Sequence, residues 1–141
     1  MDRAFFLDKA VAFAAGHRPC ATCRRADYTA FKAAWRAAGL GGSSAKDMDG
    51  LLHDARTDPA TGGQSIWHAD LDDLPTGTFV TVDDRPHLVT PRGLHAYTPD
   101  GYSTLSKPTK KGTGVIVQTP RPLVALMLTG YRPALHHTVR L

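Results

Sequence analysis

The chain has 141 residues, of which 42% are hydrophobic and 21% charged, as in an ordinary globular protein. A chain of this length can bury a core without help from a metal or disulfides, so one domain over 1–141 is expected. The net charge of +4 and the pI near 9.3 favour an anionic partner such as nucleic acid. No apolar run approaches the ~20 residues of a membrane span, and the first residues lack the apolar region of a secretory signal. We therefore expect a cytoplasmic protein without membrane association.

The first half of the chain predicts helices. Asp8 is a suitable N-cap for a short helix through Ala15, which Gly16 ends in a left-handed conformation. A second helix is expected over about 27–38, where apolar residues recur at helical spacing. Ser44, three residues before an aspartate, resembles a capping box. It opens a third helix that ends at His53 or Arg56.

The second half is punctuated by glycine and proline and favours strands. A hairpin is predicted across Asp83-Asp84. A last helix is predicted to begin at Thr119-Pro120, with Thr119 as its cap, and to end at Gly130. The expected strands are 5–7, 78–82, 86–90, 94–98 and 115–117, and the expected loops are 57–64 and 103–114.

Both cysteines lie in the segment Gly16-His17-Arg18-Pro19-Cys20-Ala21-Thr22-Cys23-Arg24-Arg25. Two thiolates at Cys-x-x-Cys spacing can bind one metal ion, most often zinc, whereas a disulfide framework needs more cysteines and an oxidising compartment. Two alternatives stay open, namely a dithiol redox couple at a helix start and a pair of buried cysteines without chemistry. We expect an α+β fold in which N-terminal helices surround the Cys-x-x-Cys metal loop, followed by a small antiparallel sheet and a C-terminal helix.

Residues Phe5 to Arg25, with a short strand, an alanine-rich helix and Gly-x-Arg-Pro-Cys-x-x-Cys, resemble the second half of the Ada-type zinc-binding domain. In that family the domain belongs to bacterial DNA alkylation-repair regulators and binds zinc through four cysteines. The resemblance covers about a sixth of the chain. It implies that Cys20 and Cys23 correspond to the second ligand pair of the family, and that the protein is associated with DNA.

Because the chain has no third cysteine, further zinc ligands are expected among histidines and carboxylates. His53 is the first choice, since Asp49 lies four residues earlier on the same face of a helix and can orient the imidazole or join the site. A solvated Asp–His pair is the alternative. His68 and His95 each flank an aromatic residue and are expected to be partly buried and bonded to the backbone. The seven histidines are His17, His53, His68, His87, His95, His136 and His137.

Cationic side chains accompany the cysteine segment and the second long loop, where they can contact phosphates or simply be solvated. The candidates for binding nucleic acid are Arg18, Arg24, Arg25, Lys107, Lys110 and Lys111. The sequence Gly16-His17-Arg18-Pro19 is echoed by Gly130-Tyr131-Arg132-Pro133. Two helix ends followed by a proline explain this echo, and the alternative is a shared anion-binding face of Arg18 and Arg132.

These observations favour a zinc protein associated with nucleic acid. A metal-dependent hydrolase is the alternative, because two cysteines and His53 leave one zinc position for water, with Asp49, Asp54 or His17 as general base. The chain contains no glutamate, which argues strongly against a zinc deaminase of the His-x-Glu type. A protein-interaction domain with purely structural zinc also fits the sequence.

Overall fold

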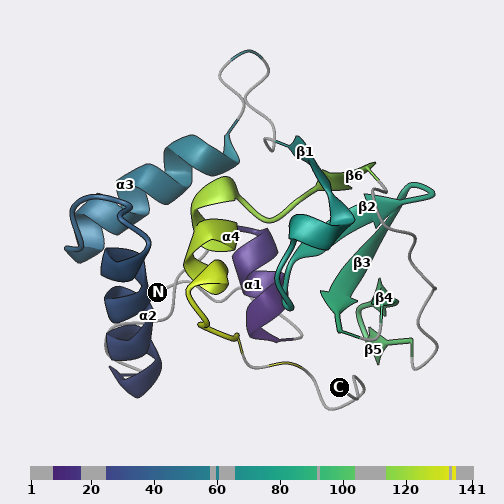
Figure 1. Ribbon diagram of the computed structural model, residues 1–141, viewed down its shortest axis with the longest axis horizontal. Helices are drawn as coiled ribbons and strands as arrows, with labels where there is room; N and C mark the ends of the chain where they lie inside the picture. Colours follow the sequence, from purple (N-terminus) through teal and green to yellow (C-terminus); the bar gives the residue numbers. More distant parts are fainter. Residues whose placement is uncertain are drawn as a thin grey trace.

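The structure is a computed structural model that describes residues 8–16, 25–57, 60, 66–91, 93–103, 114–133 and 135. Within these residues the fold is α+β, as predicted, with four α-helices and one six-stranded antiparallel sheet (Figure 1). The helices are α1 (Lys9–Ala14), α2 (Arg25–Ala37), α3 (Ala45–Arg56) and α4 (Arg121–Leu128). The strands are β1 (Trp67–Asp70), β2 (Phe79–Val82), β3 (Arg85–Thr90), β4 (Gly93–Thr98), β5 (Gly101–Tyr102) and β6 (Gly114–Val117), with a 3₁₀ turn at Leu71–Asp73.

Local capping explains where the helices begin. The backbone N–H of Val11 donates to the Asp8 carboxylate (3.0 Å), and the N–H of Asp47 donates to Ser44 Oγ (3.1 Å), so both predicted N-caps are confirmed. The second helix begins two residues earlier than expected, and the third ends at Arg56.

The prediction for the start of the last helix was wrong in one respect. Pro120 is the N-cap of α4, and the Thr119 side chain has another partner. Its Oγ1 accepts a hydrogen bond from the backbone N–H of Phe79 (2.9 Å), which joins β2 to the chain leaving β6.

The sheet has the order β1-β6-β2-β3-β4-β5, and every neighbouring pair is antiparallel. The predicted hairpin is confirmed, with Phe79 opposite Leu88, and Asp83 and Asp84 at its turn have φ values of 52° and 61°. This is the left-handed backbone of a type I′ turn. Strands β1 and β5 were not predicted. The predicted strand 5–7 lies outside the described residues, as does most of the loops 57–64 and 103–114.

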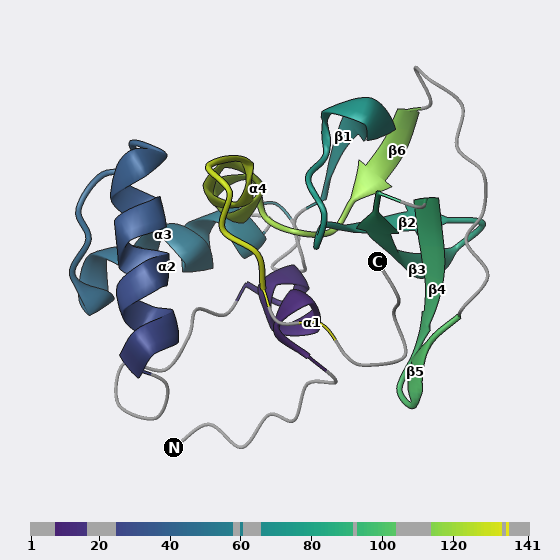
Figure 2. The ribbon, with the colours of Figure 1, turned by 60° about the horizontal axis from the view of Figure 1, so that its bottom comes forward.

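Helices α1 and α4 lie between the other two helices and the sheet (Figures 1 and 2). Each of these two helices packs in both directions. Helix α4 contributes Leu126 to the core between the helices and Val124 to the core against the sheet. Helix α1 contributes Phe13 to the core between the helices and Ala10 to a cluster on the opposite face of the sheet. The helical core consists of Phe13, Phe31, Ala34, Trp35, Met48, Leu52, Leu123, Leu126 and Met127. The main sheet core consists of Leu71, Leu74, Val80, Val89, Leu94, Val115, Val117 and Val124.

Candidate metal site and its surroundings

Most of the predicted site lies outside the described residues. This holds for the metal ligands Cys20 and Cys23, for the candidate base His17, and for the cations Arg18, Arg24, Lys107, Lys110 and Lys111. Arg25 opens α2, but its side chain is also outside the description. The metal loop around which the helices were expected to gather therefore stays a prediction. The structure does describe the two residues that flank the cysteine segment, Gly16 and Arg25.

Gly16 fixes the place where the cysteine segment begins. It ends α1 with φ +83°, a left-handed conformation that glycine tolerates and side chains rarely adopt. The glycine also lies against Arg56 at the end of α3. A Cβ on Gly16 would lie 2.6 Å from Cδ of Arg56 and 3.2 Å from its Cβ. The end of α1 is thus packed directly on the stem of Arg56.

His53 is exposed on α3, one turn before Arg56. Asp49 is exposed one turn earlier still, so Asp49, His53 and Arg56 form a stripe on one side of the helix, while Met48 and Leu52 face the helical core. Because Gly16 contacts the last member of this stripe, the end of α1 lies against the last turn of α3, one turn from His53. Sequence reasoning missed Arg56, although its spacing from His53 is a local feature that places both on one face.

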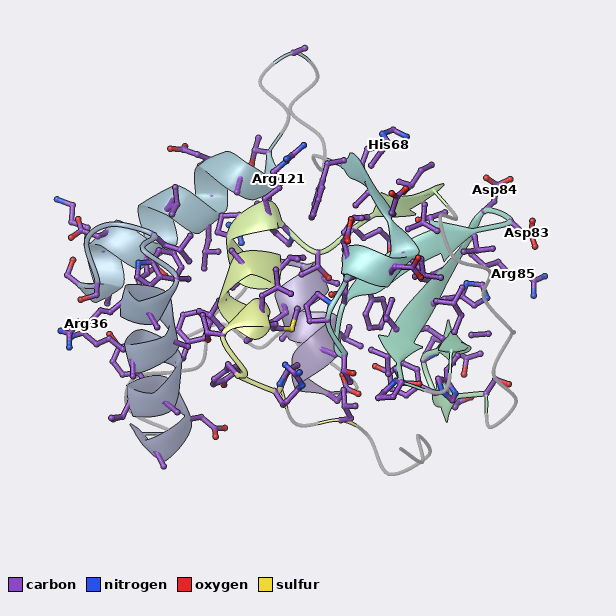
Figure 3. The ribbon with its side chains drawn as sticks, in the orientation of Figure 1. Arg36, His68, Asp83, Asp84, Arg85 and Arg121 are labelled. Carbon is purple, nitrogen blue, oxygen red and sulfur yellow. The ribbon has the colours of Figure 1, made fainter. Side chains whose placement is uncertain are left out.

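Three further histidines are described, of which two are buried and hydrogen-bonded and one is exposed. His95 is 1% exposed, its Nδ1 lies 2.9 Å from the Ser103 carbonyl oxygen, and its Nε2 lies 2.8 Å from Thr90 Oγ1. The predicted hydrogen bond to the backbone is therefore confirmed for His95, which is buried more completely than the partly buried histidine expected. His87 is also buried, with Nδ1 2.9 Å from the carbonyl oxygen of Arg85. The same prediction was wrong for His68, which is exposed on β1 because its side chain lies on the solvent side of the edge strand (Figure 3).

The second Gly-x-Arg-Pro segment caps a helix. Arg132 Nη1 donates to the Met127 carbonyl oxygen (2.8 Å) in the last turn of α4 and to the Tyr131 carbonyl oxygen (3.1 Å), after Gly130 has turned the chain at φ +112°. The helix-end interpretation of this segment is thus confirmed. The Tyr131 ring stacks on Phe13 of α1, with 5.8 Å between centroids, so this helix end lies beside α1.

Two tyrosines have pKa values displaced by their surroundings. Burial, and to a lesser extent the Asp27 carboxylate, raises the pKa of Tyr131 to about 12. Burial and the neighbouring Asp8 carboxylate raise the pKa of Tyr102 well above its ordinary range. Both phenols therefore stay neutral at physiological pH. Both side chains pack in clusters to which α1 contributes, and neither lies on the stripe of α3.

Charge is unevenly divided along the chain. The cysteine segment, residues 16–25, holds three arginines, residues 104–113 hold three lysines, and neither segment contains an aspartate. The rest of the chain holds eleven lysines and arginines and thirteen aspartates. The net positive charge of the chain therefore comes from these two segments.

No group of three or more histidine, cysteine or aspartate side chains with metal-site geometry occurs within the described residues. Among the same residues, none of the helices has the length and apolar character needed to cross a bilayer. Comparison of the chain with protein-family models, with curated proteins and with solved structures gave no match.

Proposed function

We propose that this protein binds a zinc ion through Cys20, Cys23 and His53 and that it associates with nucleic acid. The observation that supports the metal site is the contact between Gly16 and Arg56, because it brings the start of the cysteine segment to the end of α3. The Cys-x-x-Cys spacing supplies the chemistry, and His53 is the exposed imidazole nearest to that contact along α3.

Chain length is compatible with this ligand set. Cys20 follows Gly16 by four residues, and an extended chain advances about 3.3–3.6 Å per residue. His53 and Arg56 are three residues apart on α3, so their Cβ atoms are separated by roughly 5–6 Å. A thiolate of the segment and the His53 imidazole therefore have the reach to share one ion, with bonds of about 2.3 Å and 2.0 Å.

Nucleic-acid association is supported by the division of charge. Since aspartates outnumber lysines and arginines in the rest of the chain, an anionic polymer would be attracted mainly to the two cationic segments, residues 16–25 and 104–113. The proposed phosphate contacts are Arg18, Arg24, Arg25, Lys107, Lys110 and Lys111. Arginines on both sides of Cys20 and Cys23 would place phosphate contacts next to the metal.

The hydrolase alternative rests on Asp49, which is exposed one turn from His53 on the same face of α3. With two cysteines and one histidine as ligands, a fourth zinc position would hold water, and Asp49 or His17 would serve as its base. Zinc-dependent hydrolysis that is abolished in Asp49→Asn, with zinc content unchanged, would favour this alternative over a purely binding role.

The zinc proposal is tested by metal content of protein purified without a metal-affinity tag. We expect zinc in the unmodified chain, and its loss in Cys20→Ser and in His53→Ala. His68→Ala is the matched control, because His68 is likewise an exposed histidine but is placed on β1 (Figure 3). A metal-free unmodified protein would overturn the proposal, and retention of zinc by His53→Ala would remove His53 from the ligand set.

The nucleic-acid proposal is tested by the salt dependence of binding. Replacing Arg24 and Arg25 together by alanine should weaken binding and reduce the log–log salt slope by about 0.9 for each phosphate that the variant no longer neutralises. Arg36→Ala is the control, since Arg36 is exposed near the opposite end of α2 and its Nε donates to Ser43 (3.0 Å). Salt-independent binding, or none, would contradict the proposal.

A further inference from the structure

An arginine–tryptophan stack joins the edge of the sheet to the start of α4. Cζ of Arg121 lies 4.6 Å from the centroid of the Trp67 ring, although the two residues are far apart in the chain. Trp67 is the first residue of β1, and Arg121 is the first residue of α4. Sequence reasoning did not find this pair, because no local pattern relates the two positions.

Hydrogen bonding and packing hold the indole in place. Trp67 Nε1 donates to the Thr119 carbonyl oxygen (2.8 Å), and the ring packs partly against the main sheet core. The Thr119 side chain is itself bonded to β2. The ring is therefore attached to the fold through the junction between β6 and α4, and Arg121 is stacked on a fixed surface.

The arginine side of the stack is open to solvent. Arg121 is exposed at the rim of the molecule (Figure 3), and within the described part of the chain no carboxylate forms an ion pair with it. The result is a surface on which a planar, exposed cation lies over an aromatic ring.

We propose that Trp67 and Arg121 form a stacking site for an unpaired base of a single-stranded nucleic acid. This inference rests on the proposed association with nucleic acid and names the form of nucleic acid and a point of contact. A guanidinium plane stacks on a base and attracts the phosphates on either side of it, which an ammonium group cannot do in the same way. Such stacking is tolerant of sequence, because every base has a π face.

Tryptophan fluorescence can test this proposal, because the two tryptophans of the chain differ in burial. Trp35 is 0% exposed in the helical core, whereas Trp67 is only partly buried. Adding a short oligothymidylate to the full chain should quench tryptophan fluorescence through Trp67 alone, so Trp67→Phe should abolish the response while Trp35→Phe keeps it. A duplex of the same length should bind with much less quenching, because its bases are already stacked.

Matched variants separate stacking from charge. Arg121→Ala should weaken oligothymidylate binding about tenfold, and Arg121→Lys should restore only the salt-dependent part. Arg85→Ala removes the same charge from the β2–β3 hairpin, away from Arg121 (Figure 3), and should have a small effect. Circular dichroism establishes that each variant is folded.

The outcomes distinguish this inference from the function on which it rests. If the unmodified protein binds neither single-stranded nor duplex nucleic acid, the proposed function fails. If it binds but Trp67 is not quenched, or if Arg121→Lys binds as well as the unmodified protein, nucleic-acid association stands and the stacking site is overturned. Arg121 would then serve only to cover the indole ring.

Discussion

His95 in the sheet and His53 on helix α3 have opposite surroundings. In the sheet, His95 is buried and both ring nitrogens have partners, in Thr90 and Ser103. On α3, Asp49 and His53 are exposed on a face that turns away from the helical core. One region uses a histidine to hold strands together, and the other presents a histidine at the surface.

This difference indicates where function can reside. A buried ring with two hydrogen bonds is costly to disturb, because one ring nitrogen is engaged as a donor and the other as an acceptor. An exposed imidazole costs the fold little and can take part in metal binding once the cysteine segment supplies thiolates. The comparison therefore gives His95 a part in stability and leaves His53 accessible for the metal binding proposed above, and each of these statements is testable.

The largest expected effect is the loss of stability in His95→Leu. Because the Ser103 carbonyl oxygen only accepts, Nδ1 carries the proton and Nε2 accepts from the Thr90 hydroxyl. Leucine would remove the acceptor of the Thr90 hydroxyl, whose other contact, with the Gly93 carbonyl oxygen, is long (3.4 Å), and the donor to the Ser103 carbonyl oxygen, at a cost of about 2–4 kcal/mol. Urea unfolding with a chelator present measures this cost without a contribution from metal.

His53→Leu is the matched control for that measurement. As an exposed substitution it should change the free energy of unfolding by less than about 0.5 kcal/mol under the same chelating conditions. A large destabilisation by His53→Leu in the presence of chelator, or a small one by His95→Leu, would reverse the roles that the structure gives the two histidines.

Smaller effects, of opposite sign to each other, are expected from two buried threonines at the start of β2 and the end of β6. Thr119→Val removes the acceptor of the Phe79 N–H and should destabilise the protein by about 1–3 kcal/mol. Thr78 is also 0% exposed, but its Oγ1 has no hydrogen-bond partner among the described residues, so Thr78→Val should stabilise by about 1 kcal/mol. Thermal unfolding of the two isosteric variants measures both. Equal effects would show that Thr78 has a partner in the folded protein.

Features determined by neighbouring residues were predictable from the sequence. The caps at Asp8 and Ser44, the helix end at Gly16 and the hairpin across Asp83-Asp84 each depend on a few consecutive residues. Strand β5 escaped prediction because two residues carry no periodicity. Strand β1 does alternate apolar and polar residues, which is a strand signal, but over only four residues, and sequence reasoning overlooked it.

The candidate site was predictable only in its chemistry. The Cys-x-x-Cys spacing and the position of His53 on a helix are local, so sequence reasoning found them. The contact between Gly16 and Arg56, the stack of Arg121 on Trp67, and the bond of Thr119 to β2 join residues from different elements. Such contacts depend on tertiary packing, and no period or motif in one sequence encodes them.

The smallest expected effect concerns the turn of the β2–β3 hairpin. The predicted hairpin is formed, but its two turn residues are not those that the backbone conformation of the turn favours. Asp83 and Asp84 both have positive φ, and type I′ turns prefer Asn-Gly or Asp-Gly because a side chain is strained in this conformation. Asp84→Gly should therefore stabilise the protein by about 0.5–1 kcal/mol, measured as a higher urea midpoint.

Asp100→Gly is the control for that effect, since Asp100 lies in the β4–β5 turn and is not among the described residues with positive φ. There glycine only adds freedom to the unfolded chain and should destabilise the protein slightly. Zinc content should be the same in both variants, because both turns belong to the sheet, whereas His53 lies on α3 and Cys20 and Cys23 lie between α1 and α2 in the sequence. A hairpin change that altered metal content would mean that the two regions are coupled, and the division between a structural sheet and a ligand-binding helical side would have to be abandoned.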